Sequence, residues 1–241
     1  MARRRFFVES VERGRAEIRG EDAHHLTRVL RVETGQKFEI SDNRCVYLAE
    51  VETARKDLVS FAIIEPVQTT EPVLYATLLA SLTKFDRFEA MLEKATELGV
   101  EQVIPVQAER SEKGLEQAAG KRLARWKRIA REASEQSRRV RLPSIELPIE
   151  LADALRTEGG YRYVLDEAGA VPILSALPKA RQPGDRVILL VGPEGGWTDR
   201  ERDAFQAAGW TPVSLGHRIL RADTAAIAAL AILNAAWESP A

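Results

Sequence analysis

From residue 73 onward, short apolar segments alternate with segments that have a helical pattern, and this alternation is the strongest constraint on the fold. The pattern predicts strands at 73–80, 100–106, 161–166, 186–192 and 211–216, and helices at 85–99, 121–139, 149–157, 199–208 and 224–237. Strands that alternate with helices are typical of a parallel sheet covered on both faces. We therefore expect an α/β fold for this part of the chain.

The beginning of the chain has a different pattern. Residues 5–66 contain brief alternating or β-branched segments with turn signals between them, and one helical pattern at 21–31 that Asp22 can cap. This region is predicted to form a small β-barrel-like module. The stretch 65–72, EPVQTTEP, is polar and proline-flanked, which is typical of a linker. We expect two domains, 1–70 and 71–241.

Composition excludes several classes of protein. The single cysteine rules out a disulfide within the chain, and the three histidines are not spaced as zinc ligands, so no metal is expected. The first residues lack the apolar core of a signal peptide, and no apolar run approaches the length of a membrane span. We expect a soluble, cytoplasmic protein.

The net charge of -1 conceals clusters of basic residues. Residues 121–141 contain nine Lys and Arg against two acids, and residues 1–31 contain eight Arg against five acids. Clustered arginine favours a polyanionic partner such as a nucleic acid. A solvated helix face would produce the same pattern, so both interpretations remain open at this point.

A glycine-rich turn follows the most apolar of the predicted strands. Residues 187–191, VILLV, lead directly into 192–196, GPEGG, and a helical segment follows. In α/β sheets, ligands bind at the carboxyl ends of strands. The turn matches neither a P-loop nor a dinucleotide-binding fingerprint, and Glu194 would repel a phosphate. The turn favours a ligand that is neutral or cationic nearby, although a tight structural connection would also use these residues.

A second strand end changes the balance between these two interpretations. Residues 213–225, VSLGHRILRADTA, end a strand at Leu215-Gly216 and continue with apolar residues instead of a polar loop. Two glycine-containing strand ends can form a slot for a flat, uncharged group such as adenine. Backbone N–H and C=O groups would then recognise the edges of that group.

Taken together, GPEGGW and LGHRILRADTA closely resemble the signature of the RsmE family of SPOUT-class RNA methyltransferases. The resemblance extends over nearly the whole chain. It includes SLTKFDRFEAMLEKATELGV at 81–100, ERS at 109–111, RWKRIAREASEQSRR at 125–139, and RRFFV and HHLTRVLR near the beginning. Several motifs in the same order make the resemblance specific.

The resemblance implies a fold and an activity. The fold would be an α/β SPOUT-type domain at 71–241 with a C-terminal trefoil knot, preceded by a PUA-like β-barrel that binds RNA at 1–70. The cofactor would be S-adenosyl-L-methionine, and the reaction would be methylation of uridine N3 in small-subunit (16S) ribosomal RNA. The protein would act as a homodimer. A SPOUT-type enzyme for another RNA base and a non-catalytic RNA-binding protein remain the alternatives.

Site residues follow by carrying over the motifs. The predicted cofactor-binding residues are Leu165, Gly192, Glu194, Gly195, Gly196, Leu215, Gly216, Ile219, Leu220 and Arg221. Arg221 and Glu194 are the catalytic candidates, because N3 must lose a proton and the uracil carbonyls gain charge. For Glu194 a binding role is favoured over that of a base. The predicted RNA-binding residues are Arg3, Arg4, Arg5, Arg28, Arg138 and Arg139.

The chain departs from the family pattern at two places. Trp197 stands where the family usually has Phe, and Ala222-Asp223 stand where Thr-Glu is common. The carboxylate of Asp223 is therefore one methylene shorter. Asp is strongly preferred at helix N-caps, so we expect Asp223 to cap the last helix.

Overall fold

The computed structural model describes residues 4–239, and the chain divides into two compact units. Unit 1 comprises Met1–Thr70 and Ser134–Leu142, and unit 2 comprises Glu71–Ala133 and Pro143–Ala241. The sequence places 134–142 in the second domain, and the structure groups this segment with the first. Hydrogen bonds explain the difference, because the Leu142 amide donates to the Asn43 side-chain oxygen at 3.0 Å and the Ser41 hydroxyl donates to the Val140 carbonyl.

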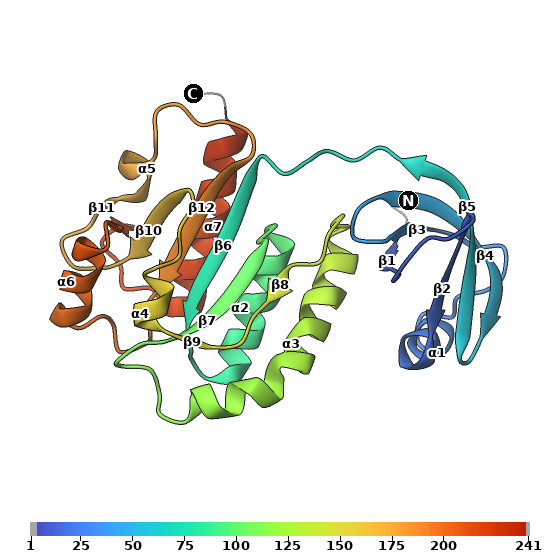
Figure 1. Cartoon of the computed structure of the whole chain (residues 1–241), viewed down its shortest axis with the longest axis horizontal. Coiled ribbons are helices and arrows are strands. Elements are labelled where there is room, and N and C mark those ends of the chain that lie inside the picture. Colours follow the sequence, from blue (N-terminus) through green and yellow to red (C-terminus); the bar gives the residue numbers. More distant parts are fainter. Residues whose placement is uncertain (1–3, 240–241) are drawn as a thin grey trace. The chain divides into compact units, whose positions relative to one another are not determined.

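Unit 1 contains a five-stranded sheet and one helix (Figure 1). Its strands are β1 (Arg5–Phe7), β2 (Arg15–Arg19), β3 (Lys37–Ser41), β4 (Val46–Arg55) and β5 (Leu58–Val67), in the spatial order β1-β3-β4-β5-β2. β1 and β3 are parallel, and the other pairs are antiparallel. The strands lie where the alternating pattern predicts them, and β5 extends three residues into the predicted linker, to Val67.

The core of unit 1 follows from this alternation. In β2, Ala16 and Ile18 are buried while their neighbours are exposed, as a strand with one covered face requires. The helix α1 (Gly20–Arg28) contributes Ala23 and Leu26 to the same core. Asp22 lies in the first turn of α1 and is not its cap, because the helix begins at Gly20 and residue 19 holds the cap position.

Unit 2 is built on an eight-stranded parallel sheet, as the alternation of strands and helices predicts. Seven strands have the order β11-β13-β10-β12-β6-β7-β8, and β9 also pairs with β7. Their bounds are β6 (Leu74–Ser81), β7 (Gln102–Gln107), β8 (Ser144–Ile145), β9 (Ile149–Glu150), β10 (Tyr161–Leu165), β11 (Val171–Pro172), β12 (Asp185–Val191) and β13 (Thr211–Ser214).

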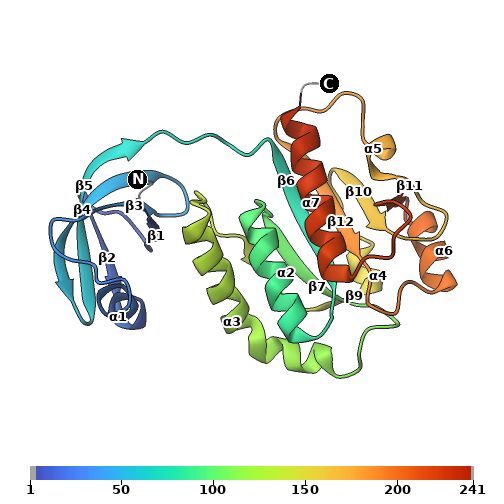
Figure 2. The ribbon, with the colours of Figure 1, turned by 180° about the vertical axis from the view of Figure 1, so that it is seen from behind.

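Both faces of this sheet are buried. Along β12, Val187, Leu189 and Val191 belong to one core cluster, while Ile188 and Leu190 belong to another. Successive side chains of a strand point to opposite faces, so a continuous apolar run marks a strand that is covered on both sides. Figure 2 shows α2, α3 and α7 in front of one face of the sheet.

The helices of unit 2 differ from the predictions mainly at their ends. They are α2 (Phe85–Glu97), α3 (Leu115–Gln136), α4 (Leu151–Ala154), α5 (Ile173–Ala176), α6 (Asp199–Ala207) and α7 (Ala222–Glu238). α3 ends before the predicted residue 139, because Arg138 has φ +57°, which a right-handed helix cannot include. α4 is shorter than the predicted 149–157, because β9 occupies the first two of these residues and the helix ends at Ala154.

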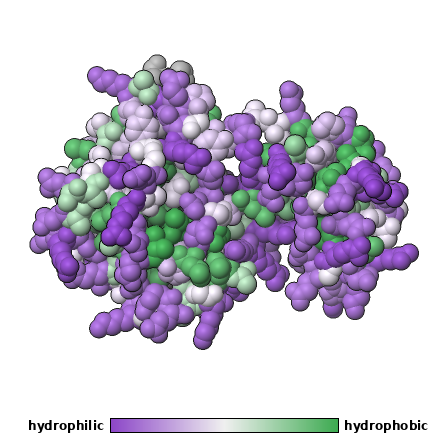
Figure 3. All heavy atoms as spheres, in the orientation of Figure 1, coloured by the Kyte–Doolittle hydropathy of each residue, from purple (hydrophilic) through white to green (hydrophobic). Residues whose placement is uncertain are grey.

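The face that Figure 3 shows is mostly hydrophilic, with a group of apolar side chains on unit 2. Among residues 4–239, no helix has the length and apolar character needed to cross a membrane. Large exposed apolar side chains include Leu174 and Ile219, with exposed fractions of 66% and 89%.

The strand order brings two distant connections to one edge of the sheet. The connection from β12 to α6 starts beside β10, and α6 leads to β13 on the other side of β10. The chain then returns from β13 to α7, which packs against α2, β6 and β12. Because parallel strands share their carboxyl edge, the segments 192–198 and 215–221 lie at the same edge.

Candidate functional site

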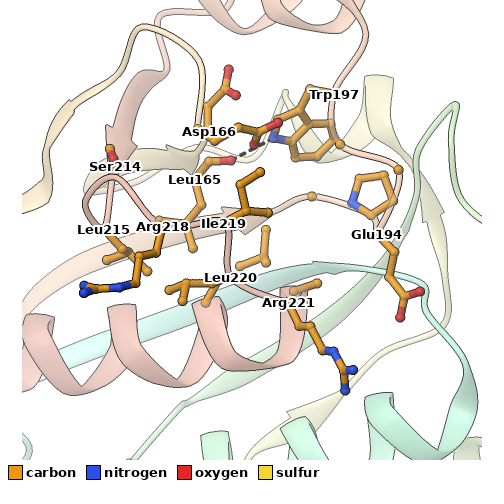
Figure 4. Close-up of a pocket in the computed structure, with 18 of the residues that line it drawn as sticks. Leu165, Asp166, Glu194, Trp197, Ser214, Leu215, Arg218, Ile219, Leu220 and Arg221 are labelled. Carbon is orange, nitrogen blue, oxygen red and sulfur yellow. Dashed lines mark hydrogen bonds between the residues drawn. The ribbon is translucent and has the colours of Figure 1, made fainter.

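A cavity of about 600 Å³ lies at this carboxyl edge, where β10, β12 and β13 end (Figure 4). Three segments of chain line it, at 165–167, 191–197 and 213–222, with contributions from Arg87 and Ala225. Each segment follows or ends a strand whose apolar residues are buried in the sheet. The rigid core therefore positions the loops that surround the cavity.

The structure brings all of the predicted cofactor residues to this one cavity. Its lining contains Leu165, Gly192, Glu194, Gly195, Gly196, Leu215, Gly216, Ile219, Leu220 and Arg221. Their assignment to a cofactor stays a prediction, but their meeting in space agrees with it. The side chain of Ile219 is 89% exposed, which is unusual for a large apolar residue and leaves an apolar surface open to a ligand or to another chain.

Contacts and backbone geometry within the protein explain why the first loop contains glycines. A Cβ atom at Gly192 would lie 2.9 Å from Cε2 of Trp197, and one at Gly195 would lie 3.0 Å from the Cβ of Arg110. Gly196 has φ +68°, a backbone conformation that favours glycine. These three glycines are therefore explained without a ligand, because the loop packs tightly against Trp197 and Arg110.

Glu194 forms an ion pair with Arg87 on α2. The hydrogen bond to Glu194 raises the pKa of the Arg87 guanidinium above its ordinary value. Both side chains are partly exposed. Figure 4 shows the charged ends of Glu194 and Arg221 directed to the same side, away from Leu165. The Glu194 carboxylate is engaged by the Arg87 guanidinium, and this contact favours a binding or orienting role for Glu194.

Two acidic residues of the cavity were missed by the sequence interpretation. Asp166 and Glu167 directly follow β10, and both line the cavity. Asp166 is buried and accepts two hydrogen bonds from Arg202 of α6, at 2.8 and 3.1 Å, which raise the pKa of that guanidinium. Glu167 is exposed. Their position immediately after a buried strand was the signal that could have found them.

Arg221 holds the N-cap position of α7, with an extended backbone at φ −66° and ψ 151°. Its side chain is exposed and lines the cavity. The expectation that Asp223 caps this helix is wrong, because α7 begins at Ala222 and Asp223 already lies in its first turn. There its carboxylate faces the positive end of the helix dipole. Asp223 also adds to the negative charge around Arg87.

The predicted RNA-binding arginines have different surroundings. Arg5 is only 5% exposed and donates to Glu39 at 2.7 Å, so the expectation that it contacts RNA is wrong. Arg138 donates to the other oxygen of Glu39 at 2.6 Å. Burial raises the pKa of the Glu39 carboxyl, but the hydrogen bonds from Arg138 and Arg5 outweigh burial and hold the pKa below its ordinary value of 4.5. This network is structural, because buried charges require partners.

Arg4 and Arg28 are exposed and remain available for RNA, whereas Arg3 lies outside the described residues. Arg139 is partly exposed and donates to the carbonyl oxygen of Arg141 at 3.1 Å. The basic helix α3 uses part of its charge internally: Arg122 and Arg125 pair with Glu89, and Arg128 pairs with Glu132. The charge cluster in the sequence therefore overstates the free basic surface. Within the described part of the chain, no group of acidic, His or Cys residues could hold a metal ion.

Comparison with known proteins agrees with this arrangement. The family model described as an RNA methyltransferase domain matches residues 69–234, and the one described as an RNA methyltransferase PUA domain matches residues 18–64. The chain is 36% identical to the ribosomal RNA small subunit methyltransferase E of Synechocystis, over 90% of this chain and 71% of that protein. It is 31% identical to the Bacillus subtilis protein of the same name, over 95% of each chain.

Solved structures have the same architecture. A ribosomal RNA small subunit methyltransferase E from Neisseria gonorrhoeae, bound to S-adenosyl methionine, is 30% identical with a TM-score of 0.88 over 98% of both chains. A methyltransferase from Legionella pneumophila, in complex with the same cofactor, is 27% identical with a TM-score of 0.88 over 98% of both chains. With the family models, the sequence relatives and the shared fold in agreement, this chain belongs to the ribosomal RNA small subunit methyltransferase E family of RNA methyltransferases.

Proposed function

We propose that this protein transfers the methyl group of S-adenosylmethionine to N3 of a uridine in 16S ribosomal RNA. The observation that carries the proposal is the cavity at the carboxyl edge, in which two glycine-containing loops and the end of β10 meet. Relatives of high structural similarity have been solved with S-adenosyl methionine bound. The identity of the base comes from the resemblance of the sequence motifs.

The residues around the cavity fit this cofactor. Leu165, Leu215 and Leu220 supply apolar surface for a purine ring, and the loop backbones supply donors and acceptors for its edges. Asp166, Glu167 and Glu194 place carboxylates in the lining beside the guanidiniums of Arg87, Arg218 and Arg221. Carboxylates suit ribose hydroxyls and a sulfonium cation. The volume of about 600 Å³ lies in the usual range for a small-molecule site.

When bound, S-adenosylmethionine supplies an activated methyl group on a positively charged sulfur. The task of the protein is then to orient the uracil ring and to stabilise the negative charge that develops when N3 loses its proton. Arg221 is the group that we assign to that charge, because its exposed guanidinium lines the cavity. Glu194, held by Arg87, would orient the glycine loop and so contribute to binding.

Uridine N3 lies on the Watson–Crick edge, so the target base must be unpaired when it reacts. We assign RNA binding to unit 1, in line with the PUA description of its family model. The exposed Arg4 and Arg28 support this assignment. We assign the exposed Arg138 and the partly exposed Arg139 to the same RNA-binding surface. Loss of phosphate-contacting arginines would weaken RNA binding and flatten its dependence on salt.

The finer architecture also belongs to this proposal. We infer a trefoil knot, because the connection from β13 to α7 returns across the strands that the β12-to-α6 connection has just crossed. Such threading is rare in proteins, and the knot is the fold that the motif resemblance implies. We also infer a homodimer, supported by the exposed Ile219 beside the cavity. The site of action is the cytoplasm, where ribosomal RNA is found.

Nucleoside analysis of ribosomal RNA from cells with and without the gene tests the function. We expect 3-methyluridine in 16S RNA to disappear without the gene and to return with the wild-type chain. Appearance of a different methylated base would indicate a SPOUT-type enzyme with another target. Calorimetry of the purified chain with S-adenosylmethionine separates an enzyme from a non-catalytic RNA-binding protein, which would show no binding.

A further inference from the structure

Trp197 joins two of the segments that line the cavity. Its side chain is buried, with 1% exposed, and its indole N–H donates to the carbonyl oxygen of Leu165 at 2.8 Å (Figure 4). Its ring lies directly against Gly192, where an added Cβ would be 2.9 Å from Cε2 and 3.1 Å from Nε1. One side chain therefore contacts the ends of both β10 and β12.

Other elements of unit 2 hold Trp197 in place. The ring packs edge-on against Phe205 of α6, with centroids 4.8 Å apart. The guanidinium of Arg110, in the loop after β7, donates to the backbone carbonyls of Gly195 at 3.0 Å and Trp197 at 3.4 Å. The buried carboxylate of Glu201 accepts from the Glu109 amide at 2.9 Å and so anchors that loop. Packing against Phe205 and hydrogen bonds from the loop after β7 therefore hold Trp197 in place.

We propose that Trp197 is a positioning residue for cofactor binding: its indole fixes the Leu165 carbonyl and the Gly192 backbone, and so holds the two cavity-lining segments in one geometry. This inference rests on the proposed use of the cavity for S-adenosylmethionine. A buried N–H···O hydrogen bond of normal length restricts both partners, and a large ring allows little sliding in a packed core. Without the indole, a ligand would have to order these segments itself when it binds, which weakens affinity.

The first test removes the hydrogen bond and keeps a ring. Trp197→Phe is expected to raise the dissociation constant for S-adenosylmethionine about tenfold, since a buried hydrogen bond is lost together with part of the packing. The KM for the cofactor should rise equally, while kcat at saturating cofactor should stay near the wild-type value. That split distinguishes positioning from general damage to the fold.

The chain offers a matched control in Trp210. It belongs to the same core cluster as Trp197, and its indole N–H donates to the Leu155 carbonyl at 3.2 Å, away from the cavity lining. Trp210→Phe should lower the thermal midpoint as Trp197→Phe does, but it should leave cofactor affinity unchanged. Equal affinity of wild type and Trp197→Phe, or an equal loss in both variants, would overturn the proposal.

The second test uses the contact with Gly192. This glycine does not need a positive φ, so the indole at 2.9 Å is the main obstacle to Gly192→Ala. The substitution should lower stability in the wild type and cost less in a Trp197→Phe background, because a single ring leaves space for the methyl group. Additive effects would contradict the inference. Thermal unfolding needs no cofactor, so this result stands even if calorimetry with the wild-type chain were to exclude the proposed function.

Discussion

Each unit contains a glutamate held by arginine, and the two arrangements differ chiefly in burial. In unit 1, Glu39 lies between Arg5 and Arg138, and the side chains of Arg5 and Glu39 are 5% and 10% exposed. In unit 2, Glu194 pairs with Arg87 beside the cavity, with exposed fractions of 43% and 32%. The chemical groups are the same in both places, so the surroundings decide what each pair does.

The difference shows why residue type alone does not assign a function. A buried ion pair must be complete, because removing one partner leaves a charge that water cannot reach. An exposed pair adds little to stability, because water screens it and ordering two long side chains costs entropy. We therefore interpret the Glu39 network as a contribution to the stability of unit 1, and the Glu194 pair as a contact that positions the loop 192–198.

The largest effect is expected from breaking the buried network. Arg5→Met should destabilise unit 1 by about 3–5 kcal/mol, because Glu39 keeps its charge but loses a buried partner. Hydrogen exchange of the strand amides at 37–41, measured against wild type, reports on this unit directly. Protection equal to that of wild type would show that Arg138 alone satisfies Glu39.

A guanidinium beside the cavity should behave in the opposite way. Arg221→Ala is expected to leave unfolding unchanged and to lower methyl transfer at least about a hundredfold, because a donor to the developing charge is lost. Arg221→Lys should recover only part of the rate, since an ammonium lacks the planar fork of donors. Single-turnover assays at saturating cofactor measure both variants. A wild-type rate in Arg221→Ala would remove Arg221 from the chemistry.

Acid should weaken unit 1 through Glu39. A carboxyl whose pKa is lower in the folded chain than in the unfolded chain stabilises the fold above its ordinary pKa, here 4.5, and this stability is lost as the pH falls through the lower folded value. Urea denaturation of wild type should therefore show a loss below pH 4.5 that Glu39→Gln lacks. If the free energy of unfolding changed with pH in the same way in both proteins, Glu39 would not be the source of the pH dependence.

The smallest effect is expected at the exposed pair. Arg87→Ala should leave the denaturation midpoint nearly unchanged and weaken S-adenosylmethionine binding by about threefold, because Glu194 loses the partner that holds its loop. Arg156→Ala, which breaks an exposed pair with Asp153, is the control and should change neither quantity. A large loss of stability in Arg87→Ala would show that the Glu194 pair stabilises the fold as the Glu39 network does.

Much of the site followed from the order of residues along the chain. The apolar run 187–191 is buried on both sides, and the residues that follow it and those after β13 meet at one cavity, as two strand ends of a parallel sheet must. Asp166 and Glu167 obey the same rule but were not predicted, because they lie outside the motifs GPEGGW and LGHRILRADTA that carry the resemblance.

The sequence by itself determined the alternation of strands and helices, the place of the strand ends and the family, because these depend on local periodicity and on contiguous motifs. Tertiary structure alone decided which charges are buried and why each glycine is needed. Glu39 meets Arg5 and Arg138 across 34 and 99 residues, and Glu194 meets Arg87 across 107. Gly192 must be glycine because the folded loop places the Trp197 ring against it. Such contacts are set by packing between distant segments, which no local pattern encodes.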